Sequence, residues 1–379
     1  MTDAPSSSAP SDLRRLWIGT YPAPGTQAGS GEGVWRVDLD VTAGRFDGAR
    51  QVVATASPSF VALSPDERTL YAVGETAEGT VSAFTVSTVD DDGLALLATL
   101  PSGGADPCHL VARPGAVWVA NYSSGTFTTV PVDGGGAFAG EPAAHAGAGT
   151  GPVTDRQEGP HAHFVAPTPD GSAAWVVDLG ADRVRRYRVV ADGTGVEPAG
   201  TTVALPPGTG PRHLVFGVPG TPGEGFAFVV GELDDRVHVL ALRTDDDGLL
   251  AADAVTSVQA CATPGPEGVG AFPSHVALSS DGTRLYVAVR GPDVVAIFDV
   301  VPDGEGVRLA HRGDAPLEGV WPRHFAVLDT AAGDVLVVAG QRSSTLEALR
   351  VRPDGGSEPL ASLSLPSPAC VVERRILEG

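Results

Sequence analysis

The stretch PSFVALSPDERTLYAVGE, residues 58–75, combines a proline, a short apolar segment, a turn and a second apolar segment. Five further segments repeat this pattern: PCHLVARPGAVWVANY (107–122), PHAHFVAPTPDGSAAWVVDL (160–179), PRHLVFGVPGTPGEGFAFVVGE (211–232), PSHVALSSDGTRLYVAVR (273–290) and PRHFAVLDTAAGDVLVVAGQ (322–341). Their leading prolines are 49, 53, 51, 62 and 49 residues apart. Hairpins at this period are typical of the four-stranded antiparallel blades of a β-propeller.

The two ends of the chain complete the repeat. A seventh copy begins at Pro368 and has one strand, while LWIGTY and GVWRVDLD near the N-terminus supply the strands that it lacks. Such closure removes unpaired sheet edges, so we predict an all-β, seven-bladed β-propeller closed by the N- and C-terminal strands in the last blade. Residues 12–379 are expected to form this single domain, residues 1–11 a flexible tail, and residues 134–159 an inter-blade connection with a mobile glycine-rich loop.

The protein is strongly acidic, because 25 Lys and Arg stand against 46 Asp and Glu, a net charge of −21. This charge repels phosphate backbones and anionic lipids, so we expect neither a nucleic-acid nor a membrane partner. The first residues lack the apolar core of a signal peptide, and three cysteines form no even disulfide framework. We predict a cytoplasmic protein that is a monomer or a weak homodimer. A P-loop and a G-x-G-x-x-G motif that opens a helix are both missing, which predicts no nucleotide cofactor.

Polar residues collect where the first strand of each hairpin begins and the second ends. In a propeller these positions meet at one mouth of the central channel. The residues that follow the leading prolines are Ser59, Cys108, His161, Arg212, Ser274, Arg323 and Ala369, and those at the ends of the second strands include Glu75, Asn121, Asp178, Glu232, Arg290 and Gln341. Three arginines that converge inside an acidic protein indicate an anionic ligand.

The histidines fall into two groups. His109, His213, His275 and His324 occupy the second place after the leading proline, and His163 aligns with them by the apolar residues that follow it. Repetition of this kind predicts a shared structural hydrogen bond, whereas His161 has no counterpart and is the stronger functional candidate. The His-x-His spacing would also allow a metal site with Glu232, but neighbouring arginines would repel a cation, so we predict no metal.

Segments along nearly the whole chain, residues 14–377, resemble the lactonase family, which includes propeller-type 6-phosphogluconolactonases and the fungal carboxymuconate lactonising enzyme. The resemblance rests on RRLWIGTY, DPCHLVARPGAVWVANYSSGT, DRQEGPHAHFVAPTPDG, GPRHLVFG with VVGELDD, PSHVALSSDGTRLYVAVRG and PRHFAVLD. It implies a catalytic set of a His (His161 or His163), Arg212, Glu232 and Arg290. Gly74, Gly231 and Gly340 stand where relatives often have Asn, a departure that bears on the hydrogen bonding of the substrate.

The resemblance implies hydrolysis of an anionic sugar lactone, with 6-phosphogluconolactone as the leading substrate. Glu232 or the His would activate water, and Arg212 and Arg290 would bind the oxyanion or the anionic group of the substrate. We expect further substrate contacts from the remaining residues of the mouth, Glu75, Asn121, Asp178, Arg323 and Gln341. Two alternatives stay open: a carboxymuconate-type cyclase and a non-catalytic propeller that binds a partner.

Overall fold

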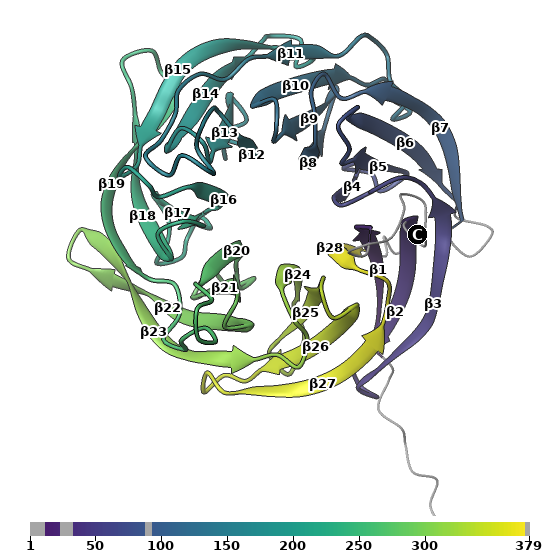
Figure 1. The fold of residues 1–379 in the computed structure, drawn as a ribbon, viewed down its shortest axis with the longest axis vertical. Coiled ribbons are helices and arrows are strands. Elements are labelled where there is room, and N and C mark those ends of the chain that lie inside the picture. Colours follow the sequence, from purple (N-terminus) through teal and green to yellow (C-terminus); the bar gives the residue numbers. More distant parts are fainter. Residues whose placement is uncertain (1–11, 23–32, 88–92, 376–379) are drawn as a thin grey trace, which may run out of the picture.

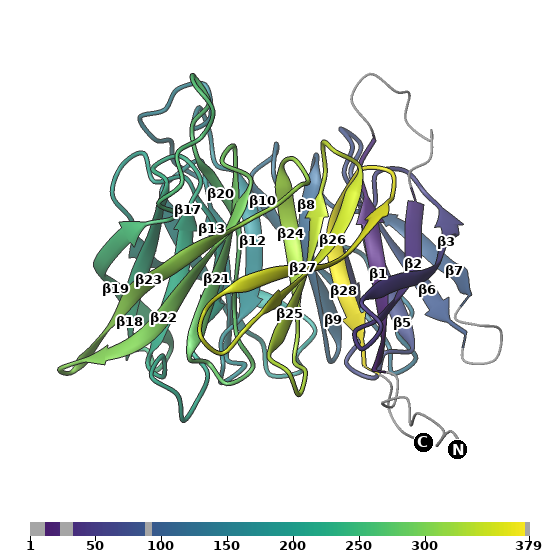
Figure 2. The ribbon, with the colours of Figure 1, turned by 90° about the horizontal axis from the view of Figure 1, so that it is seen from below.

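The computed structural model describes residues 12–22, 33–87 and 93–375, and these form seven four-stranded antiparallel sheets around a central channel (Figure 1). The predicted flexible tail, residues 1–11, lies outside the described residues. The described part of the chain contains no helix that is long and apolar enough to cross a membrane. Seen from the side, the blades stand next to one another with their strands running between two faces of the ring (Figure 2).

The strands are given from the channel outwards. Blade 1 contains β28 (Pro368–Arg374), β1 (Leu13–Thr20), β2 (Gly33–Asp40) and β3 (Arg45–Ala54). Blade 2 contains β4 (Val61–Leu63), β5 (Thr69–Gly74), β6 (Thr80–Val86) and β7 (Leu94–Pro101). Blade 3 contains β8 (Pro107–Arg113), β9 (Ala116–Asn121), β10 (Thr126–Pro131) and β11 (Ala143–His145). Blade 4 contains β12 (Ala162–Pro167), β13 (Ala173–Asp178), β14 (Arg183–Val189) and β15 (Val196–Ala204).

The remaining three blades follow in chain order. Blade 5 contains β16 (Pro211–Phe216), β17 (Phe226–Gly231), β18 (Arg236–Thr244) and β19 (Leu250–Gln259). Blade 6 contains β20 (Phe272–Leu278), β21 (Arg284–Arg290), β22 (Val294–Asp303) and β23 (Gly306–Pro316). Blade 7 contains β24 (Pro322–Leu328), β25 (Asp334–Gly340), β26 (Thr345–Val351) and β27 (Ser357–Ser364).

The predicted closure of the ring is confirmed in blade 1. Strand β28 from the C-terminal end is the inner strand and pairs antiparallel with β1, so that Trp17 faces Val372 across the ladder. Strands β2 and β3 continue the same sheet outwards. Because this ladder joins the two ends of the chain, β28 covers the edge that β1 would otherwise leave unpaired in blade 1.

Large apolar side chains fill the seams between blades. A large apolar residue of the second strand is buried in every blade, at the third position of the strand in blades 2 to 7 and at the fifth in blade 1. These residues are Trp17, Tyr71, Trp118, Trp175, Phe228, Tyr286 and Leu336. The apolar clusters each combine residues of two neighbouring blades, so each blade is packed against the next. This packing makes the ring one body and fixes the relative positions of the inner strands.

The inner strands carry a repeated irregularity. In six of the seven blades the pairing between the first and second strand shifts register near its start, which is a β-bulge. The residues at these shifts are Cys108, His163, Arg212, Ser274, Arg323 and Ala369. A bulge re-aims the side chain that it carries, which here lies at one end of the channel.

The bulge corrects our alignment of His163 with the repeated histidines. In blade 4 Ala162 pairs with Asp178 and Phe164 with Val177, so His163 takes the bulge position and Phe164 the position of the histidines. The inner strand of blade 4 therefore begins later than an alignment on its leading proline predicts. His161 lies just before the strand rather than at the bulge.

A ring of flat side chains crosses the channel next to the bulges. Phe60, His109, Phe164, His213, His275 and His324 follow one another around the axis, with ring centroids 3.9–5.4 Å apart. The predicted structural hydrogen bond exists for two of the histidines, because His109 accepts the Val165 N–H and His324 the Val371 N–H, both at 3.3 Å. In each case the donor belongs to the next blade.

Candidate active site

A cavity of about 300 Å³ lies at the end of the channel where the bulges are. Ten residues line it: Tyr21, Glu75, Cys108, Tyr122, Arg156, His163, Arg212, Glu232, Arg290 and Arg323. Four of them are bulge or strand residues of the inner strands, and most others end a second strand or directly follow it. The lining contains four arginines and two glutamates, so the cavity is positively charged within an acidic protein.

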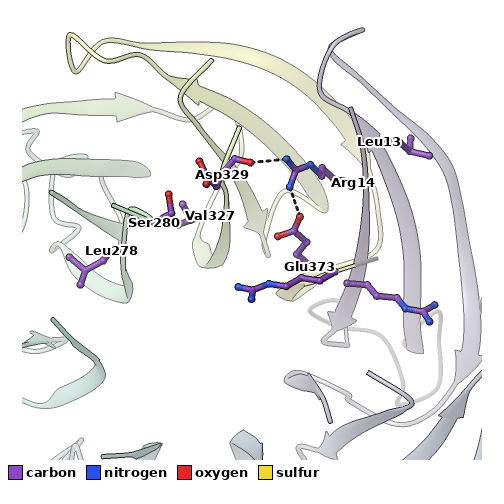
Figure 3. Close-up of a pocket in the computed structure, with 9 residues that line it drawn as sticks. Leu13, Arg14, Leu278, Ser280, Val327, Asp329 and Glu373 are labelled. Carbon is purple, nitrogen blue, oxygen red and sulfur yellow. Dashed lines mark hydrogen bonds and ion pairs between the residues drawn. The ribbon is translucent and has the colours of Figure 1, made fainter. Parts of the chain in front are cut away.

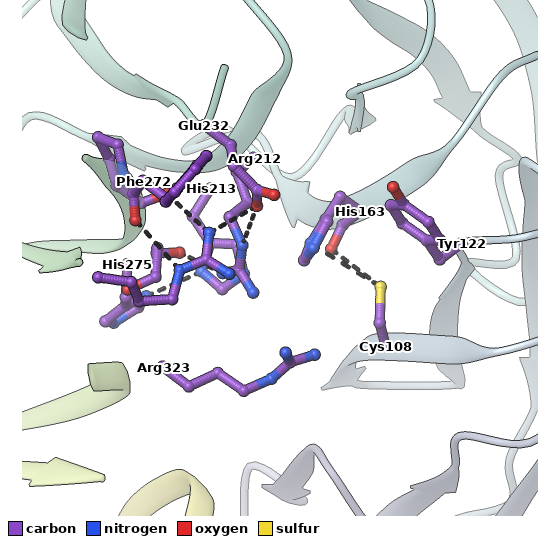
Figure 4. Close-up of polar contacts among 12 residues, drawn as sticks. Cys108, Tyr122, His163, Arg212, His213, Glu232, Phe272, His275 and Arg323 are labelled. Atoms are coloured by element: carbon purple, nitrogen blue, oxygen red, sulfur yellow. Dashed lines mark hydrogen bonds and ion pairs between the residues drawn. The ribbon is translucent and has the colours of Figure 1, made fainter. Parts of the chain in front are cut away.

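Three arginines converge on Glu232, which directly follows β17. Figure 4 shows Glu232 beside one of them, Arg212. Arg212 Nε donates to Glu232 Oε2 at 2.9 Å, and Arg290 Nη2 lies 2.8 Å from the same oxygen. Arg156 Nη2 donates to the other oxygen, Oε1, at 2.7 Å. Three guanidinium groups around one carboxylate leave a surplus of two positive charges on this side of the cavity, which we call the Glu232 cluster.

Contacts outside the Glu232 cluster hold Arg212 and Arg290 in place. Arg212 donates to the backbone oxygen of Ser274 and to His213 Nε2, the latter at 3.0 Å. Arg290 Nε donates to the Phe272 carbonyl at 3.1 Å, and its guanidinium lies 5.3 Å from the centre of the Trp321 ring. These contacts hold both side chains in one orientation before a ligand arrives, which is the preorganisation that electrostatic catalysis requires.

The charge state of the cluster follows from these contacts. Burial by itself would raise the pKa of Glu232, but the charges of Arg290 and Arg212 outweigh it and hold the pKa well below its usual range. Burial, reinforced by Arg212, lowers the pKa of His163 well below its usual value. At neutral pH the cavity therefore presents a carboxylate and a neutral imidazole.

Glu75 forms a second group on the other side of the cavity, which we call the Glu75 cluster. Tyr21 donates its hydroxyl to Glu75 Oε1 at 2.6 Å, and the Ser59 hydroxyl donates to Oε2. Arg323 Nη2 lies 3.6 Å from Oε1, and its guanidinium lies 5.1 Å from the centre of the Tyr21 ring. Burial, followed by the charge of Glu75, raises the pKa of Tyr21, so the phenol stays protonated as a donor.

His163 lies between these two groups, beside Cys108 and Tyr122. Its Nδ1 is 3.8 Å from the Cys108 sulfur, and its ring meets the Tyr122 ring edge-on at 5.5 Å. Burial, followed by the charge of Glu75, raises the pKa of the Cys108 thiol, so this cysteine remains a thiol rather than a nucleophilic thiolate.

Four predicted site residues are not in the cavity lining. His161 Nδ1 is 3.0 Å from the Tyr122 carbonyl, and its ring stacks on Tyr122. Asp178 accepts the His161 N–H and pairs with Arg185 at 3.1 Å. Gln341 is held through its backbone by Trp321 and Ser367.

Asn121, the fourth, explains the three glycines that depart from the family pattern. Its Nδ2 donates to the Ser102 carbonyl and to the hydroxyls of Thr126 and Thr128, so it ties together the outer part of its own blade. A Cβ at Gly74 would lie 2.3 Å from the Thr80 hydroxyl, one at Gly231 2.0 Å from Asp234, and one at Gly340 2.6 Å from Thr345. Other polar side chains thus lie beside these glycines, in the space that the side chain of Asn121 occupies in blade 3.

Sequence reasoning missed Arg156 as a site residue. It lies in the glycine-rich segment for which we predicted a mobile loop, and the signal that could have revealed it is its position in DRQEG, just before the His-x-His pair. The structure anchors this part of the segment, because Gln157 is fully buried and donates to Leu179 O and Asp182. The end of the segment around Gln157 is thus hydrogen-bonded to the propeller, and the mobile loop elsewhere in the segment stays a prediction.

The opposite end of the channel has a different character. A hollow of about 630 Å³ lies there, and Arg14, which crosses it, donates to the Asp329 carbonyl at 2.7 Å and to Glu373 at 2.9 Å (Figure 3). Its charge is thus paired within the wall. Among the described residues, no group of three or more His, Cys, Asp and Glu side chains could hold a metal ion. Fold and cavity together define a propeller with an arginine-rich cavity at one end of its channel.

Comparisons with known proteins agree with this class. The family described as "Lactonase, 7-bladed beta-propeller" matches residues 15–373, so the chain belongs to the lactonase family of seven-bladed β-propellers. It is 29% identical over 360 residues to the 6-phosphogluconolactonase of Bacillus subtilis, covering 94% of this chain and 97% of the relative.

Two solved structures extend the similarity to the fold. A candidate 6-phosphogluconolactonase from Bacteroides uniformis is 28% identical with a TM-score of 0.82, covering 96% of this chain and 100% of that one. The periplasmic gluconolactonase of Pseudomonas aeruginosa is 27% identical, also with a TM-score of 0.82, and the match covers 96% and 99% of the two chains.

Proposed function

We propose that this protein hydrolyses the ring ester of an anionic sugar lactone, with 6-phosphogluconolactone and water as substrates and 6-phosphogluconate as product. The observation that carries the proposal is the Glu232 cluster, in which Arg156, Arg212 and Arg290 surround one carboxylate inside a cavity. The relative from Bacillus subtilis, which bears the name of this activity, supports the same substrate.

Hydrolysis requires a water molecule to attack the carbonyl carbon while negative charge develops on the carbonyl oxygen. The new carbon–oxygen bond gives a tetrahedral intermediate, and its collapse breaks the ring ester bond and protonates the ring oxygen. We assign the developing oxyanion to Arg212 and Arg290, because both are buried, charged and held from behind. Such preorganised donors act on charge at no reorganisation cost.

We assign the role of the base to His163 rather than to Glu232. Both oxygens of Glu232 accept hydrogen bonds from guanidinium groups, so neither oxygen is free to take a proton from water. His163 is neutral at pH 7 and so has an unprotonated ring nitrogen to receive the proton of water. Glu232 then serves to hold the three arginines in place.

The Glu75 cluster favours a sugar lactone over a muconolactone. Its carboxylate already accepts two hydroxyl hydrogen bonds and lies in the cavity lining, and a carboxylate is a strong acceptor for further hydroxyl groups. A sugar lactone has several ring hydroxyls to donate, whereas the substrate of a cyclase of the carboxymuconate type has none on its chain. A non-catalytic scaffold would have no use for either cluster.

The test is lactone hydrolysis followed by acid release, corrected for spontaneous opening of the lactone. His163→Ala should lower kcat by about 10²–10⁴, the usual contribution of a general base. The matched control is His161→Ala, which removes an imidazole outside the cavity lining. It should lower kcat by about fivefold or less, because it changes only packing next to the cavity. Loss of activity in the His161 variant with full activity in the His163 variant would contradict the assignment.

We further propose a cytoplasmic enzyme that is a monomer or a weak homodimer and has no nucleic-acid partner, supported by the net charge of −21. The relative from Pseudomonas aeruginosa is periplasmic, so location is best tested directly. Fractionation of the native host and sedimentation of the purified chain would decide both points. Recovery in the periplasmic fraction, or a stable assembly larger than a dimer, would overturn them.

A further inference from the structure

Arg156 is more exposed to solvent than the other three arginines of the cavity. Its side chain is 38% exposed, whereas those of Arg212, Arg290 and Arg323 are 2%, 6% and 17% exposed. Strands and bulges supply the three deeper arginines, while a loop supplies Arg156. Arg156 thus lies at the rim, where a ligand in the cavity meets solvent.

The loop holds Arg156 in a defined position despite its exposure. The backbone N–H groups of Arg156 and Gln157 both donate to the Val153 carbonyl, at 2.9 and 2.7 Å, which forms a tight turn. Gln157 closes the turn by accepting the Val153 N–H at 3.1 Å through its side chain. Because Gln157 is fully buried, the turn is fastened to the propeller directly next to Arg156.

One nitrogen of Arg156 makes all of its polar contacts. Nη2 donates to Glu232 Oε1 at 2.7 Å and to the Tyr122 hydroxyl at 3.3 Å. The other donors, on Nε and Nη1, have no partner among the residues that the structure describes. The unused N–H groups on Nε and Nη1 of the guanidinium fork point in different directions, so each can donate one charge-assisted hydrogen bond to a phosphate oxygen.

The local charge is also suited to a phosphate ester. The Glu232 cluster has a surplus of two positive charges, and a phosphate monoester carries about −1.5 to −2 charges at pH 7. Arg212 and Arg290 donate hydrogen bonds to backbone carbonyls that hold them deep in the cavity. Arg156 is therefore the arginine of this cluster that lies at the rim. In 6-phosphogluconolactone the phosphate is on the exocyclic C6, outside the ring, so a lactone with its carbonyl in the depth of the cavity can extend this group towards the rim.

We propose that Arg156 is the specificity residue that recognises the phosphate of a phosphorylated sugar lactone and so selects it over the unphosphorylated one. This inference rests on the proposed lactone hydrolysis, which it deepens by naming how the substrate class is chosen. Arg156 contacts Glu232 as well, so a merely structural role would change the hydrolysis of both lactones equally.

The decisive measurement is the ratio of kcat/KM for 6-phosphogluconolactone to kcat/KM for glucono-δ-lactone. Arg156→Gln should lower this ratio by about 10- to 150-fold, the effect of losing hydrogen bonds between charged groups. Arg156→Lys keeps the charge without the fork and should lower it less. The matched control, Arg188→Gln, removes a half-exposed arginine outside the cavity lining and should leave the ratio unchanged. An unchanged ratio in Arg156→Gln overturns the proposal.

Binding of inorganic phosphate separates this inference from the proposed function. If the wild-type protein hydrolyses neither lactone, the proposed function fails, and the thermal midpoint in phosphate still tests Arg156. Phosphate should raise the midpoint of the wild-type protein and of Arg188→Gln, and the rise should disappear in Arg156→Gln. Circular dichroism establishes that the variants are folded. A rise that persists in Arg156→Gln, or no rise in the wild-type protein, overturns the inference.

Discussion

Glu75 and Glu232 occupy the same position in blades 2 and 5, on different sides of the channel. Each follows the glycine that ends a second strand, and each donates its backbone N–H to the residue before the leading proline, Ser57 or Gly210. Their side chains nevertheless have different partners. Glu75 accepts two hydroxyls and has one arginine at 3.6 Å, whereas Glu232 is surrounded by three arginines.

The comparison shows that the blade position fixes where a side chain lies and the neighbouring blades fix what it does. Glu232 receives Arg212 from its own blade, Arg290 from blade 6 and Arg156 from the connection before blade 4. Glu75 receives Ser59 from its own blade and Tyr21 from blade 1. One carboxylate therefore organises positive charge, and the other is a hydrogen-bond acceptor for hydroxyl groups.

Of the two glutamates, Glu232 is expected to have the larger effect on activity when it is replaced by Gln. Gln keeps the shape but removes the charge that balances three arginines, so the arginines would lose their common anchor and repel one another. We expect kcat for lactone hydrolysis to fall by about 10²–10³, the range for losing a preorganised oxyanion donor. Steady-state kinetics with correction for spontaneous opening measures it. Wild-type kcat in this variant would remove the distinction between the two glutamates.

A smaller effect with a different signature is expected from Glu75→Gln. If Glu75 binds hydroxyls of the substrate in both the ground state and the transition state, its loss should raise KM by about 10-fold and change kcat little. The comparison is sharpest when both variants are measured on the same lactone. A fall in kcat as large as that of Glu232→Gln would mean that Glu75 takes part in the chemical step.

The smallest effect concerns the ring of flat side chains that crosses the channel next to the bulges. Burial lowers the folded-state pKa of His109, His163, His213 and His275 well below the usual value, and that of His324 to about 3. The unfolded chain takes up protons on these rings below about pH 6.5 and the folded chain does not, so stability present at neutral pH is lost as the pH falls.

Each such histidine should contribute a slope of about 1.4 kcal/mol per pH unit to the free energy of unfolding below pH 6.5. His109→Phe should lower the slope of the unfolding free energy with pH by that amount. Phe should fit at this position, since Phe60 and Phe164 occupy equivalent places in the ring. At pH 7.5 the variant should be less stable by about 1–3 kcal/mol, because the Val165 N–H loses its acceptor. Urea denaturation at several pH values tests both; an unchanged slope would contradict the neutral state of His109.

The fold could be predicted because its signal is local and repeated. A leading proline and two apolar segments recur in each blade, and the lone strand at Pro368 requires partners that LWIGTY and GVWRVDLD can supply. The same repetition located six of the ten residues that line the cavity, Glu75, Cys108, Arg212, Glu232, Arg290 and Arg323, because equivalent strand positions gather at one end of the channel.

The sequence by itself determined the seven blades, the closure of the ring and the kinds of side chain at the channel mouth, since all of these depend on short repeated patterns. The tertiary structure alone decided which of these side chains meet. The residue types in blade 4 do not predict its β-bulge. This bulge places His163 in the cavity lining and leaves His161 outside it. Arg156 reaches Glu232 across 76 residues of chain because Gln157 is buried between neighbouring segments. Such contacts depend on the register of a ladder and on packing between blades, which are properties of the closed ring rather than of any single stretch of sequence.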